Sequence, residues 1–569
     1  MVEYQVRTLS SDNYRIDTAF NETTPNDSVI RAFGQSVILI EGCIFNAVKF
    51  VQKNKNEDFA TSAFNLLKNA QCKMNIRAFR GDFAGAMFDS DTQQWKGFTD
   101  HLGIHPLYYY HDPNVFIVAT HIHYITEALR DLGISYSLDE DGACYMLGFG
   151  YMLESTTLIQ GIYRLQAGRY FEFDAEHWTL NVEHYYKPDN TTKCKLSYPD
   201  ILEQANALFR HAVAMGIERD RQAGKIPIFH LSDGLDCRLT AFVAEDLGCE
   251  NKLILNYSQS HSTQYSDPRA IMAELSGTFF QMPLDGGGHL TRHIDHWFEN
   301  LGGIAGYEPG GSPLFDFFNI INWKKYGMNH NGHAGDFMFG SYLKGNTHTP
   351  PCFPHVEPVR LKNRIYHQGQ DIIKQYPNTE MYYLQSRVTN YAITGPRYHG
   401  AVTCSNSPFI DPDFVDFMLS VPPHYKTRKT NMRIDLICAF YPKAAKTPYH
   451  KIGKSIADTK IVFDNWKKTL VQKWTKSCKK RLARVGIGRK IFHNDCGMIP
   501  LDIWYSTNPL FRNWIDDTWH ANIEHLPRGL RHYAEETFQT TGIQYKLNAL
   551  SLLYACKRFF FVGETRIPE

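Results

Sequence analysis

The sequence lacks the marks of several large protein classes. No stretch approaches the ~20 consecutive apolar residues that a membrane-spanning helix needs, and the first residues contain no apolar segment of a secretory signal. The 12 cysteines include no CxxC pair, which argues against a disulfide scaffold or a zinc site. The formal net charge is +1, so no global field favours nucleic acid. These absences predict a packed protein of the reducing cytoplasm, with no transmembrane segment and no nucleic-acid partner.

The chain is long enough to form more than one core. It has 569 residues, of which 43% are apolar, whereas single cores stop growing near ~250–300 residues. The polar, turn-rich segment 186–195 predicts a linker. We therefore expect a first domain over residues 1–190 and a second over residues 195–569.

One segment of the second domain, residues 226–248, has the pattern of a phosphate-binding turn. Residues 226–229 predict a buried strand, and a helix with one apolar face follows the polar turn at 232–237. Backbone N–H groups at a helix start favour an anion, and Gly234 lets a ligand approach the backbone. Ser232 offers a hydroxyl, and Asp236 is suited to a divalent cation. The alternative is an ordinary turn that caps the helix.

Strands and helices alternate through the rest of this part of the chain. Strands are predicted at 252–257 and 279–284, and helices at 201–215 and 266–275. Such alternation is typical of a parallel, doubly wound α/β sheet, in which ligands bind at the carboxyl ends of the strands. A closing apolar helix is expected at 544–561.

The first domain is predicted to be α+β, with two layers of sheet flanked by helices. Short strands are expected at 36–40, 84–89 and 115–119, and a helix at 58–69. Residues 161–170 predict a turn that leads into a further strand.

Four blocks of sequence resemble the asparagine synthetase family. Residues 232–237 are similar to its pyrophosphate loop S-G-G-L-D-S, with Asp233 and Cys237 as departures. Residues 41–46 stand where the family has N-G-E-I-Y-N, residues 80–86 where it has G-x-F-A-F-A, and residues 100–109 nearly repeat D-x-L-G-I-K-P-L-Y-Y. The resemblance implies a first domain like class II glutamine amidotransferases, of the Ntn type. It implies a PP-loop second domain, like adenine nucleotide alpha hydrolases, with a helical C-terminal extension.

The residue that the family uses to hydrolyse glutamine is missing. That chemistry needs a cysteine directly after the initiator Met, whose removal exposes an amine able to act as base. Here the position is Val2, and the nearest thiol, Cys43, is expected to be a buried structural residue. The sequence therefore predicts a domain that keeps the amidotransferase fold and has lost glutaminase activity.

Residues 330–340 resemble the family loop S-G-E-G-S-D-E-x-x-G-G. Asp336 matches the Asp that helps to hold metal and pyrophosphate, so the resemblance implies that it shares Mg²⁺ with Asp236. Phe337 replaces the following Glu. His333 falls where the synthetases have Glu, and a neutral imidazole is a suitable acceptor for the proton of an attacking amine. The alternative is a loop histidine bonded to a neighbouring carbonyl.

Two further blocks complete the expected site. Residues 405–411 resemble R-x-P-F-L-D, and residues 442–453 resemble a segment whose Lys stabilises the adenylate transition state. Lys451 is the matching residue, with Lys446 and Lys443 as competitors. The implied cofactors are ATP and Mg²⁺. The residues expected at ATP and pyrophosphate are Leu231, Ser232, Gly234, Leu235, Asp236, Cys237, Arg238, Tyr257 and Gly335.

A basic amphipathic helix is predicted at 466–484. It is either a core-facing helix with a solvated cationic face or a contact for an anionic partner.

The function expected is that of an ATP-dependent ligase that joins a small-molecule or peptide carboxylate to an amine or ammonia. A lasso-peptide or other macrolactam cyclase, with a peptidase partner and a precursor peptide, stays open. So does a uronic-acid amidating enzyme of surface-polysaccharide synthesis. Asp233 and Phe337 favour a further hypothesis, a pseudo-enzyme that binds a nucleotide or a partner without turnover.

Overall fold

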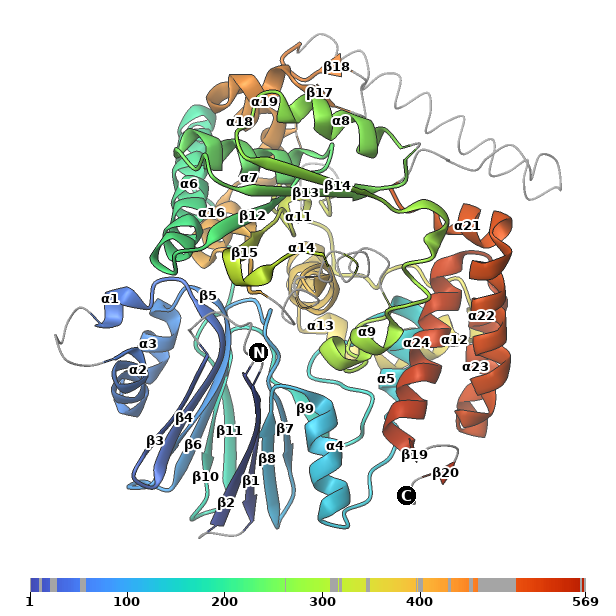
Figure 1. The fold of residues 1–569 in the computed structure, drawn as a ribbon. Coiled ribbons are helices and arrows are strands. Elements are labelled where there is room, and N and C mark those ends of the chain that lie inside the picture. The colour runs from blue at the N-terminus through green and yellow to red at the C-terminus, as the bar shows by residue number, and fades with distance from the viewer. Residues whose placement is uncertain are drawn as a thin grey trace.

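The computed structural model describes most of the chain. The described residues are 2–9, 13–20, 28–51, 58–260, 262–307, 316, 320–343, 348–395, 397, 403–427, 431–449, 454–458, 498–562 and 565–566. Figure 1 shows two antiparallel sheets in the lower part of the molecule, a parallel sheet above them and a group of C-terminal helices beside both.

The first domain contains two antiparallel sheets packed face to face. The five-stranded sheet has the order β2 (Asn13–Phe20), β1 (Val2–Leu9), β8 (Val115–Ala119), β7 (Tyr108–His111) and β9 (Ile162–Arg164). The six-stranded sheet has the order β11 (Thr179–His184), β10 (Arg169–Asp174), β6 (Gln94–Thr99), β5 (Gly81–Asp89), β4 (Ser36–Ile44) and β3 (Val29–Phe33). Buried side chains from both, among them Leu39, Phe116 and Phe171, form the core between them.

Helices cover the outer faces of these sheets. The helices α1 (Val48–Val51), α2 (Phe59–Lys68) and α3 (Cys72–Ala78) lie beside the six-stranded sheet, and α4 (Ile122–Asp131) lies beside the five-stranded one (Figure 1). The predicted arrangement of two sheet layers flanked by helices is therefore confirmed. A further helix, α5 (Glu140–Phe149), packs instead against the C-terminal helices.

The second domain contains a five-stranded parallel sheet. Its order is β14 (Thr278–Pro283), β13 (Leu253–Ser258), β12 (Ile226–His230), β15 (Tyr326–His330) and β16 (Ser405–Asn406). The chain runs outward from β12 in one direction and then returns to build the other side from β15. The strand order thus reverses between β12 and β15, the position where such sheets bind ligands.

The helices between these strands agree with the alternating pattern. α6 (Tyr198–Gln222) is longer than the predicted 201–215, because Ser197 caps its start and Gly216 and Asp220 continue the buried face beyond residue 215. α7 (Leu235–Asp246) follows β12 as expected. α8 (Thr263–Met272) begins before the predicted residue 266.

The remaining elements are mostly short helices. They are η1 (Asp285–Gly287), α9 (Ile294–Leu301), η2 (Trp323–Lys325), α11 (Gly335–Met338), α12 (Val359–Gln368), α13 (Gln370–Lys374), α14 (Thr379–Tyr383), the π-helix η3 (Leu384–Ala392), η4 (Pro408–Ile410), α16 (Pro412–Ser420), α17 (Pro423–Lys426), α18 (Met432–Phe440) and α19 (Pro442–Lys446), with the small hairpins β17 (Pro448–Tyr449)–β18 (Lys454–Ser455) and β19 (Phe561–Val562)–β20 (Thr565–Arg566).

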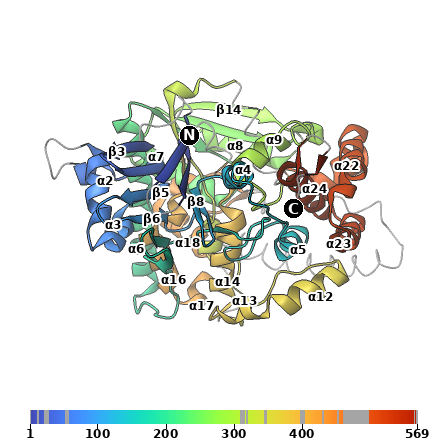
Figure 2. The ribbon, with the colours of Figure 1, turned by 90° about the horizontal axis from the view of Figure 1, so that it is seen from below.

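The C-terminal helices form a group of their own. They are α21 (Leu501–Thr507), α22 (Pro509–Asn522), η5 (Ile523–His525), α23 (Arg528–Gln539) and α24 (Ile543–Phe560). α24 is the predicted closing helix, and it packs against α22, α23 and α5 (Figure 2). The predicted basic helix at 466–484 lies outside the described residues.

The two domains meet through both polar and apolar contacts. Arg80 Nη2 donates to both carboxylate oxygens of Asp413, at 3.1 and 3.0 Å, and the Tyr186 hydroxyl donates to Asp416 at 2.8 Å. The predicted linker 186–195 lies between the end of β11 and the start of α6. The exact domain limits at 190 and 195 stay a prediction.

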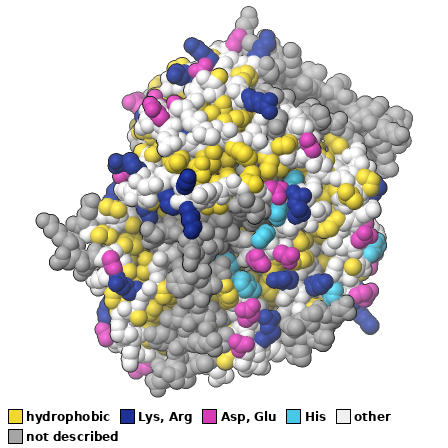
Figure 3. Space-filling model, viewed as in Figure 1, with side chains coloured by type: hydrophobic (Ala, Val, Ile, Leu, Met, Phe, Trp, Pro, Cys, Tyr) yellow, Lys and Arg dark blue, Asp and Glu magenta, His cyan; other side chains and the backbone are white. Residues whose placement is uncertain are grey.

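Two further observations concern the distribution of charge on the surface and the suitability of the described helices for crossing a membrane. On the face that Figure 3 shows, basic and acidic side chains are interspersed, with no broad area of one sign. Among the described residues, none of the helices combines the length and apolar character that a membrane crossing needs.

Candidate functional site

The first site loop joins β12 to α7. The Asn256 side-chain amide donates to the Leu231 carbonyl at 2.8 Å and so fixes the start of the loop on β13. Within the loop the Gly234 N–H donates to Ser232 Oγ at 3.1 Å. Leu231 and Leu235 are buried in the core, so the strand-turn-helix unit predicted from residues 226–248 is confirmed.

The Asp233 side chain does not face solvent from this loop. The residue is 1% exposed, and its backbone carbonyl accepts a hydrogen bond from Arg238. The acidic departure from the family loop is therefore directed inward rather than presented to a ligand at the loop surface.

The second site loop, between β15 and α11, packs directly on the first. A methyl group at Gly335 would lie 2.5 Å from the Asp236 carboxyl carbon, and one at Gly332 would lie 2.7 Å from the Cys237 nitrogen. Only glycine allows this approach. Ala334 has a left-handed conformation, with φ of 64°, which non-glycine residues seldom adopt. The loops that carry Asp236 and Asp336 are thus neighbours, as the sequence predicts.

Arg433, which sequence reasoning missed, is bonded to the first of these two acids and is influenced by the charge of the second. Its Nη1 is hydrogen bonded to Asp236 Oδ1. Burial disfavours its charge, but the carboxylates of Asp236 and, more weakly, Asp336 raise the pKa of Arg433 above its usual value. Its side chain is 9% exposed, and its Nε–H has no acceptor among the described residues. A donor of this kind suits a phosphate oxygen.

The two carboxylates fit a magnesium ion that is held jointly with phosphate. Within the described part of the chain, no group of three or more His, Cys, Asp or Glu side chains is placed to hold a metal. Mg²⁺, however, is usually bound by one or two carboxylates together with water and substrate phosphates. Asp236 and Asp336 therefore suit an ion that arrives with a nucleotide rather than a resident one.

His333 is a neutral imidazole in the same loop. Burial lowers its pKa to about 4, against the opposing effects of the Ala392 backbone and the Asp336 charge. Its carbonyl accepts from Ser407 Oγ at 2.8 Å, and its N–H donates to Asn331 Oδ1 at 3.1 Å. The ring contacts the position of Gly395. His333 is thus firmly placed, three residues from Asp336, and able to accept a proton.

Three other residues, Cys237, Arg238 and Tyr257, were expected to contact ATP or pyrophosphate. Burial, and after it the Asp236 charge, raises the pKa of Cys237 to about 11, so its thiol is protonated. The Arg238 guanidinium is fully buried and donates to the carbonyls of Asp233, Ala444, Thr447 and Pro448. This arrangement favours a structural role for Arg238. Tyr257, half-buried at the end of β13, has its ring 5.8 Å from that of His230.

Three lysines are candidates for stabilising the transition state, and the structure describes two of them. Lys451 lies outside the described residues. Its competitors Lys443 and Lys446 are both exposed on α19.

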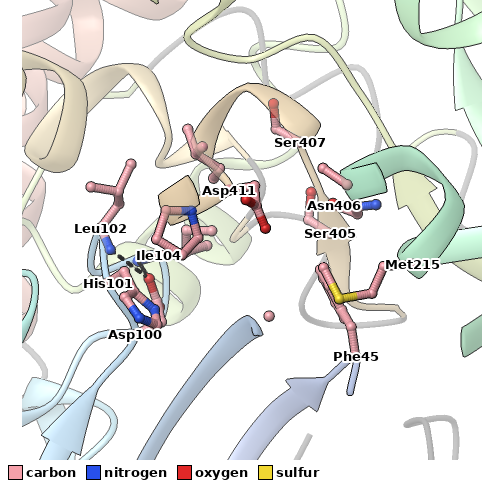
Figure 4. Close-up of a pocket in the computed structure, with 14 residues that line it drawn as sticks. Phe45, Asp100, His101, Leu102, Ile104, Met215, Ser405, Asn406, Ser407 and Asp411 are labelled. Carbon is pink, nitrogen blue, oxygen red and sulfur yellow. Dashed lines mark hydrogen bonds between the residues drawn. The ribbon is translucent and has the colours of Figure 1, made fainter. Parts of the chain in front are cut away.

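A small cavity lies under β16 at the domain junction. Its volume is about 30 Å³, which is room for roughly one water molecule. In Figure 4, Asp100, Leu102 and Ile104 of the first domain face Ser405, Asn406 and Ser407 of the second, and Asp411 points into the space between them. The cavity is too small for a substrate.

A larger junction cavity of about 440 Å³ is lined by residues of both domains, including Glu154, Arg169, Lys187 and Tyr376. None of its lining residues belongs to the loops 231–236 and 332–336.

The first domain holds a second charged cluster, which is closed. His105 Nδ1 is bonded to Asp82, and its Nε2 lies 3.6 Å from Glu41 Oε1. Burial alone would lower the pKa of His105, but Asp82 and then Glu41 raise it to about 9. Cys43 is also buried, with its sulfur 3.8 Å from that of Met328, as expected of a structural residue.

Two comparisons by sequence bear on these domains. A family model described as a glutamine amidotransferase domain matches residues 19–186. An amidase of Gibberella zeae, chry2, is 24% identical over 229 residues, which cover 36% of this chain and 32% of the relative. A protein of Methanocaldococcus jannaschii whose name places it among glutamine-hydrolysing asparagine synthetases is 22% identical over 225 residues, covering 38% and 42%. The match spans less than half of either relative.

Solved structures give weaker likenesses. A Bacillus subtilis glutamine phosphoribosylpyrophosphate amidotransferase is 12% identical, covers 43% of this chain and 58% of that one, and has a TM-score of 0.22. An NAD⁺ synthetase of Burkholderia pseudomallei is also 12% identical, covers 45% and 96%, and has a TM-score of 0.19. Scores this low do not establish a shared fold. The chain is thus similar to glutamine amidotransferase domains over residues 19–186 and, over part of its length, to an asparagine synthetase.

Proposed function

We propose that this protein is an AMP-forming carbon–nitrogen ligase without glutaminase activity. ATP would supply the leaving group that activates a carboxylate as an acyl-adenylate, and an amine or ammonia would then form the amide. The observation that carries this proposal is the contact between the loops of Asp236 and Asp336, at the point where the strand order of the parallel sheet reverses.

Each group of the site has a place in this proposal. The N-terminus of α7, with Ser232 and Gly234, would bind pyrophosphate oxygens. Asp236 and Asp336 would hold Mg²⁺ between the phosphates, and the Nε–H of Arg433 would donate to a phosphate oxygen. His333 would accept the proton that the attacking amine must lose. Lys451 stays the expected cation for the developing charge at the reacting centre.

ATP–pyrophosphate exchange with a panel of carboxylic acids tests the ligase. We expect exchange with at least one acid in the wild type and a loss of about 10–100-fold or more in Asp236→Asn and Asp336→Asn, because even residues next to a metal ligand cost that much. Asp246→Asn is the matched control, since the exposed Asp246 ends the same helix and pairs with Arg210. Exchange that survives in both site variants would remove the proposal.

Incubation with glutamine tests the second half of the proposal. Val2 offers no nucleophile and Cys43 is buried, so no glutamate should form. The nitrogen would then come from free ammonia or from an amine of the substrate. Robust glutamate production would contradict this. The described cysteines have free thiols, which supports the expected cytoplasmic location.

A nucleotide-binding pseudo-enzyme is the second candidate, and the bond between Arg433 and Asp236 favours it. A protein cation already engages one of the two expected metal ligands. Under this alternative ATP would bind without any exchange activity. Equilibrium binding of ATP with and without Mg²⁺, run beside the exchange assay, separates the two: the ligase requires tighter binding with Mg²⁺ and turnover, whereas the pseudo-enzyme shows neither.

A further inference from the structure

The larger cavity at the domain junction has the size and position of a ligand site. Its volume is about 440 Å³, and small-molecule pockets of ~300–1,000 Å³ occur preferentially between domains. The first domain supplies Arg169 of β10 and His184 of β11, which are opposite each other in the ladder, and then Lys187. The second domain supplies Tyr376 and part of η3. His184 and Lys187 are exposed, so the cavity can be reached from solvent.

This cavity does not include the loops of the proposed active site. The residues of η3 that line it are Leu384, Gln385, Thr389 and Asn390. Because residues five apart lie on one face of a π-helix, these four share a face. Ala392 presents its backbone to His333, and neither of these two residues is among the described residues that line the cavity. A molecule in the cavity would therefore occupy a second site.

Arg169 brings a cation and an unused donor to the cavity. The residue is half-buried. Its Nε–H is buried and has no acceptor among the described residues, and no described carboxylate forms an ion pair with its guanidinium. Buried polar groups without partners are uncommon in folded proteins. A ligand that accepts a hydrogen bond would satisfy this group.

A second cation lies near the first. Partial burial, and then the charges of Arg169 and Lys187, lower the pKa of His184. Both charges are therefore close to this imidazole and to each other. Lys187, like Arg169, has no acidic partner among the residues that the structure describes. One end of the cavity thus carries two positive charges that the protein does not pair.

The acids of the lining already have donors. The Oε1 atom of Glu154 accepts from the Tyr376 hydroxyl, and its Oε2 atom accepts from Gln166 at 2.6 Å. The Asp189 carboxylate accepts from the Thr191 N–H at 3.0 Å and from the Thr191 hydroxyl at 2.6 Å. Since the carboxylates are engaged and the cations are not, the cavity matches an anion rather than a cation.

Part of the lining is apolar. Leu102 of the first domain and Met381 and Leu384 of the second are 1%, 3% and 0% exposed, and all three line the cavity. A small inorganic anion would leave this surface in contact with water, whereas a ligand with an apolar body would cover it. The cavity therefore matches a molecule that has an anionic end and an apolar body.

We propose that this cavity binds a phosphate monoester with an apolar body, whose phosphate contacts Arg169 and Lys187. Two cations match the nearly double charge of a monoester at neutral pH. The arginine fork and the lysine ammonium are both suited to phosphate oxygens. The inference goes beyond the proposed ligase and does not depend on it, since it uses none of the groups assigned to ATP or Mg²⁺.

Thermal stabilisation by three small anions tests this proposal. Phenyl phosphate has the double charge and a ring, methyl phosphate has the charge without the ring, and benzenesulfonate has the ring with a single charge. A ligand that binds the folded state raises the melting temperature. For the full-length protein at pH 8 and fixed ionic strength, without Mg²⁺, we expect phenyl phosphate to reach half of its effect at a concentration about tenfold or more below that of either other probe.

Variants of the lining locate the effect. Arg169→Gln and Lys187→Gln should each weaken the response to phenyl phosphate about tenfold or more, because a charge-assisted contact is lost. Lys187 is exposed, so its variant reports on binding even where Arg169→Gln is less stable. Gln385→Trp should abolish the response by filling the cavity while every charge is kept. Arg77→Gln is the matched control, since Arg77 also lies at the domain junction but pairs with Asp416 at 3.6 Å.

Two variants of the site loops exclude binding at the proposed nucleotide site. Ser232→Ala and Arg433→Gln should keep the wild-type response to phenyl phosphate. The inference is overturned if phenyl phosphate does not stabilise the wild type, if the three probes act at similar concentrations, or if the response survives unchanged in the three lining variants. A response lost in both site-loop variants also overturns it. ATP–pyrophosphate exchange tests the ligase separately, so either proposal can fail while the other stands.

Discussion

Two clusters in this molecule combine one cation with two carboxylates, and they differ in how far their side chains are exposed. In the first domain, Glu41, Asp82 and His105 are 1%, 2% and 8% exposed. In the second, Asp336 is exposed, the Asp236 side chain is 21% exposed, and the Arg433 Nε–H has no acceptor among the described residues. The charged groups of the first cluster thus satisfy one another, whereas the second cluster keeps an Arg433 donor without an acceptor among the described residues.

The difference follows from the elements that carry the residues. Glu41 and Asp82 lie on the paired strands β4 and β5, where the ladder fixes both backbones. Asp236 and Asp336 lie in the first turns of two helices that face each other across glycines. Fixed strands favour a cluster that stabilises the fold, while helix starts leave room for phosphate. The comparison therefore predicts that the first cluster stabilises the fold, while the second has the chemical role given to it in the proposed function.

The largest effect is expected from His105→Ala. Removing the cation leaves two buried carboxylates without their partner, which costs about 3–5 kcal/mol of unfolding free energy. Urea denaturation measures it. His105→Lys, which restores a cation, should lose less, and His177→Ala is the surface control, since His177 pairs with Asp174 at 3.0 Å but its side chain is 70% exposed. A loss in His105→Ala no larger than in the control would contradict a stabilising cluster.

The same histidine gives this effect a pH dependence. The folded-state pKa of His105, about 9, lies above the ~6.5 of an unfolded histidine. Its stabilising contribution is therefore complete below pH ~6.5 and is lost as the pH rises through about 9. The stability difference between the wild type and His105→Ala should narrow over that range.

Asp336→Asn should show the opposite pattern, with a loss of about 10–100-fold in exchange activity and little change in stability. Asp336 is exposed, and surface substitutions usually stay within about 0.5 kcal/mol. Exchange kinetics and urea denaturation on one protein preparation measure both quantities. A variant that loses stability but keeps activity would reverse the roles assigned to the two clusters.

Gly335→Ala should have a smaller effect at the same site. The added methyl would lie 2.5 Å from the Asp236 carboxyl carbon, so the carboxylate or the loop must move, at a cost of about 1–3 kcal/mol. We expect about a tenfold loss of exchange. Gly529→Ala is the control, because a methyl there, on α23, meets no atom within 4 Å. Equal activity in both variants would argue against the close contact of the site loops.

Much of the fold could be predicted from local patterns, because those patterns have local causes. The alternation of strands and helices predicted the parallel sheet, and residues 226–248 predicted a strand, a turn and a helix that the structure contains. The length of α6 was underestimated at both ends, because its cap at Ser197 stands before the apolar periodicity begins and its last residues, up to Gln222, are mostly polar.

The site was predictable only where a loop could be matched as a block. The matched blocks predicted that the loops of Asp236 and Asp336 are neighbours, as the structure has them. Arg433 was missed because it reaches Asp236 across 197 residues of sequence, a contact that no local pattern encodes. One signal was available: Arg433 stands in the first turn of α18, where the helix dipole disfavours a cation. Arg238 is the opposite case. The matched loop placed it at pyrophosphate, whereas its buried contacts with backbone carbonyls depend on the packing of α19 against α7.

The smallest effect concerns the pH dependence of catalysis. With the pKa of His333 lowered to about 4, its imidazole stays neutral from pH 8 to pH 6, so its protonation should change kcat/KM by less than about twofold. A histidine with the ordinary pKa of ~6.5 would be about three-quarters protonated at pH 6 and would cost about fourfold. Kinetics of amide formation across this range, with the acid and the amine both present and at constant ionic strength, distinguish the two. An inflection near pH 6.5 that disappears in His333→Gln would show that His333 is exposed to solvent like an ordinary histidine, and the contrast between a neutral His333 and a charged His105 would then be lost.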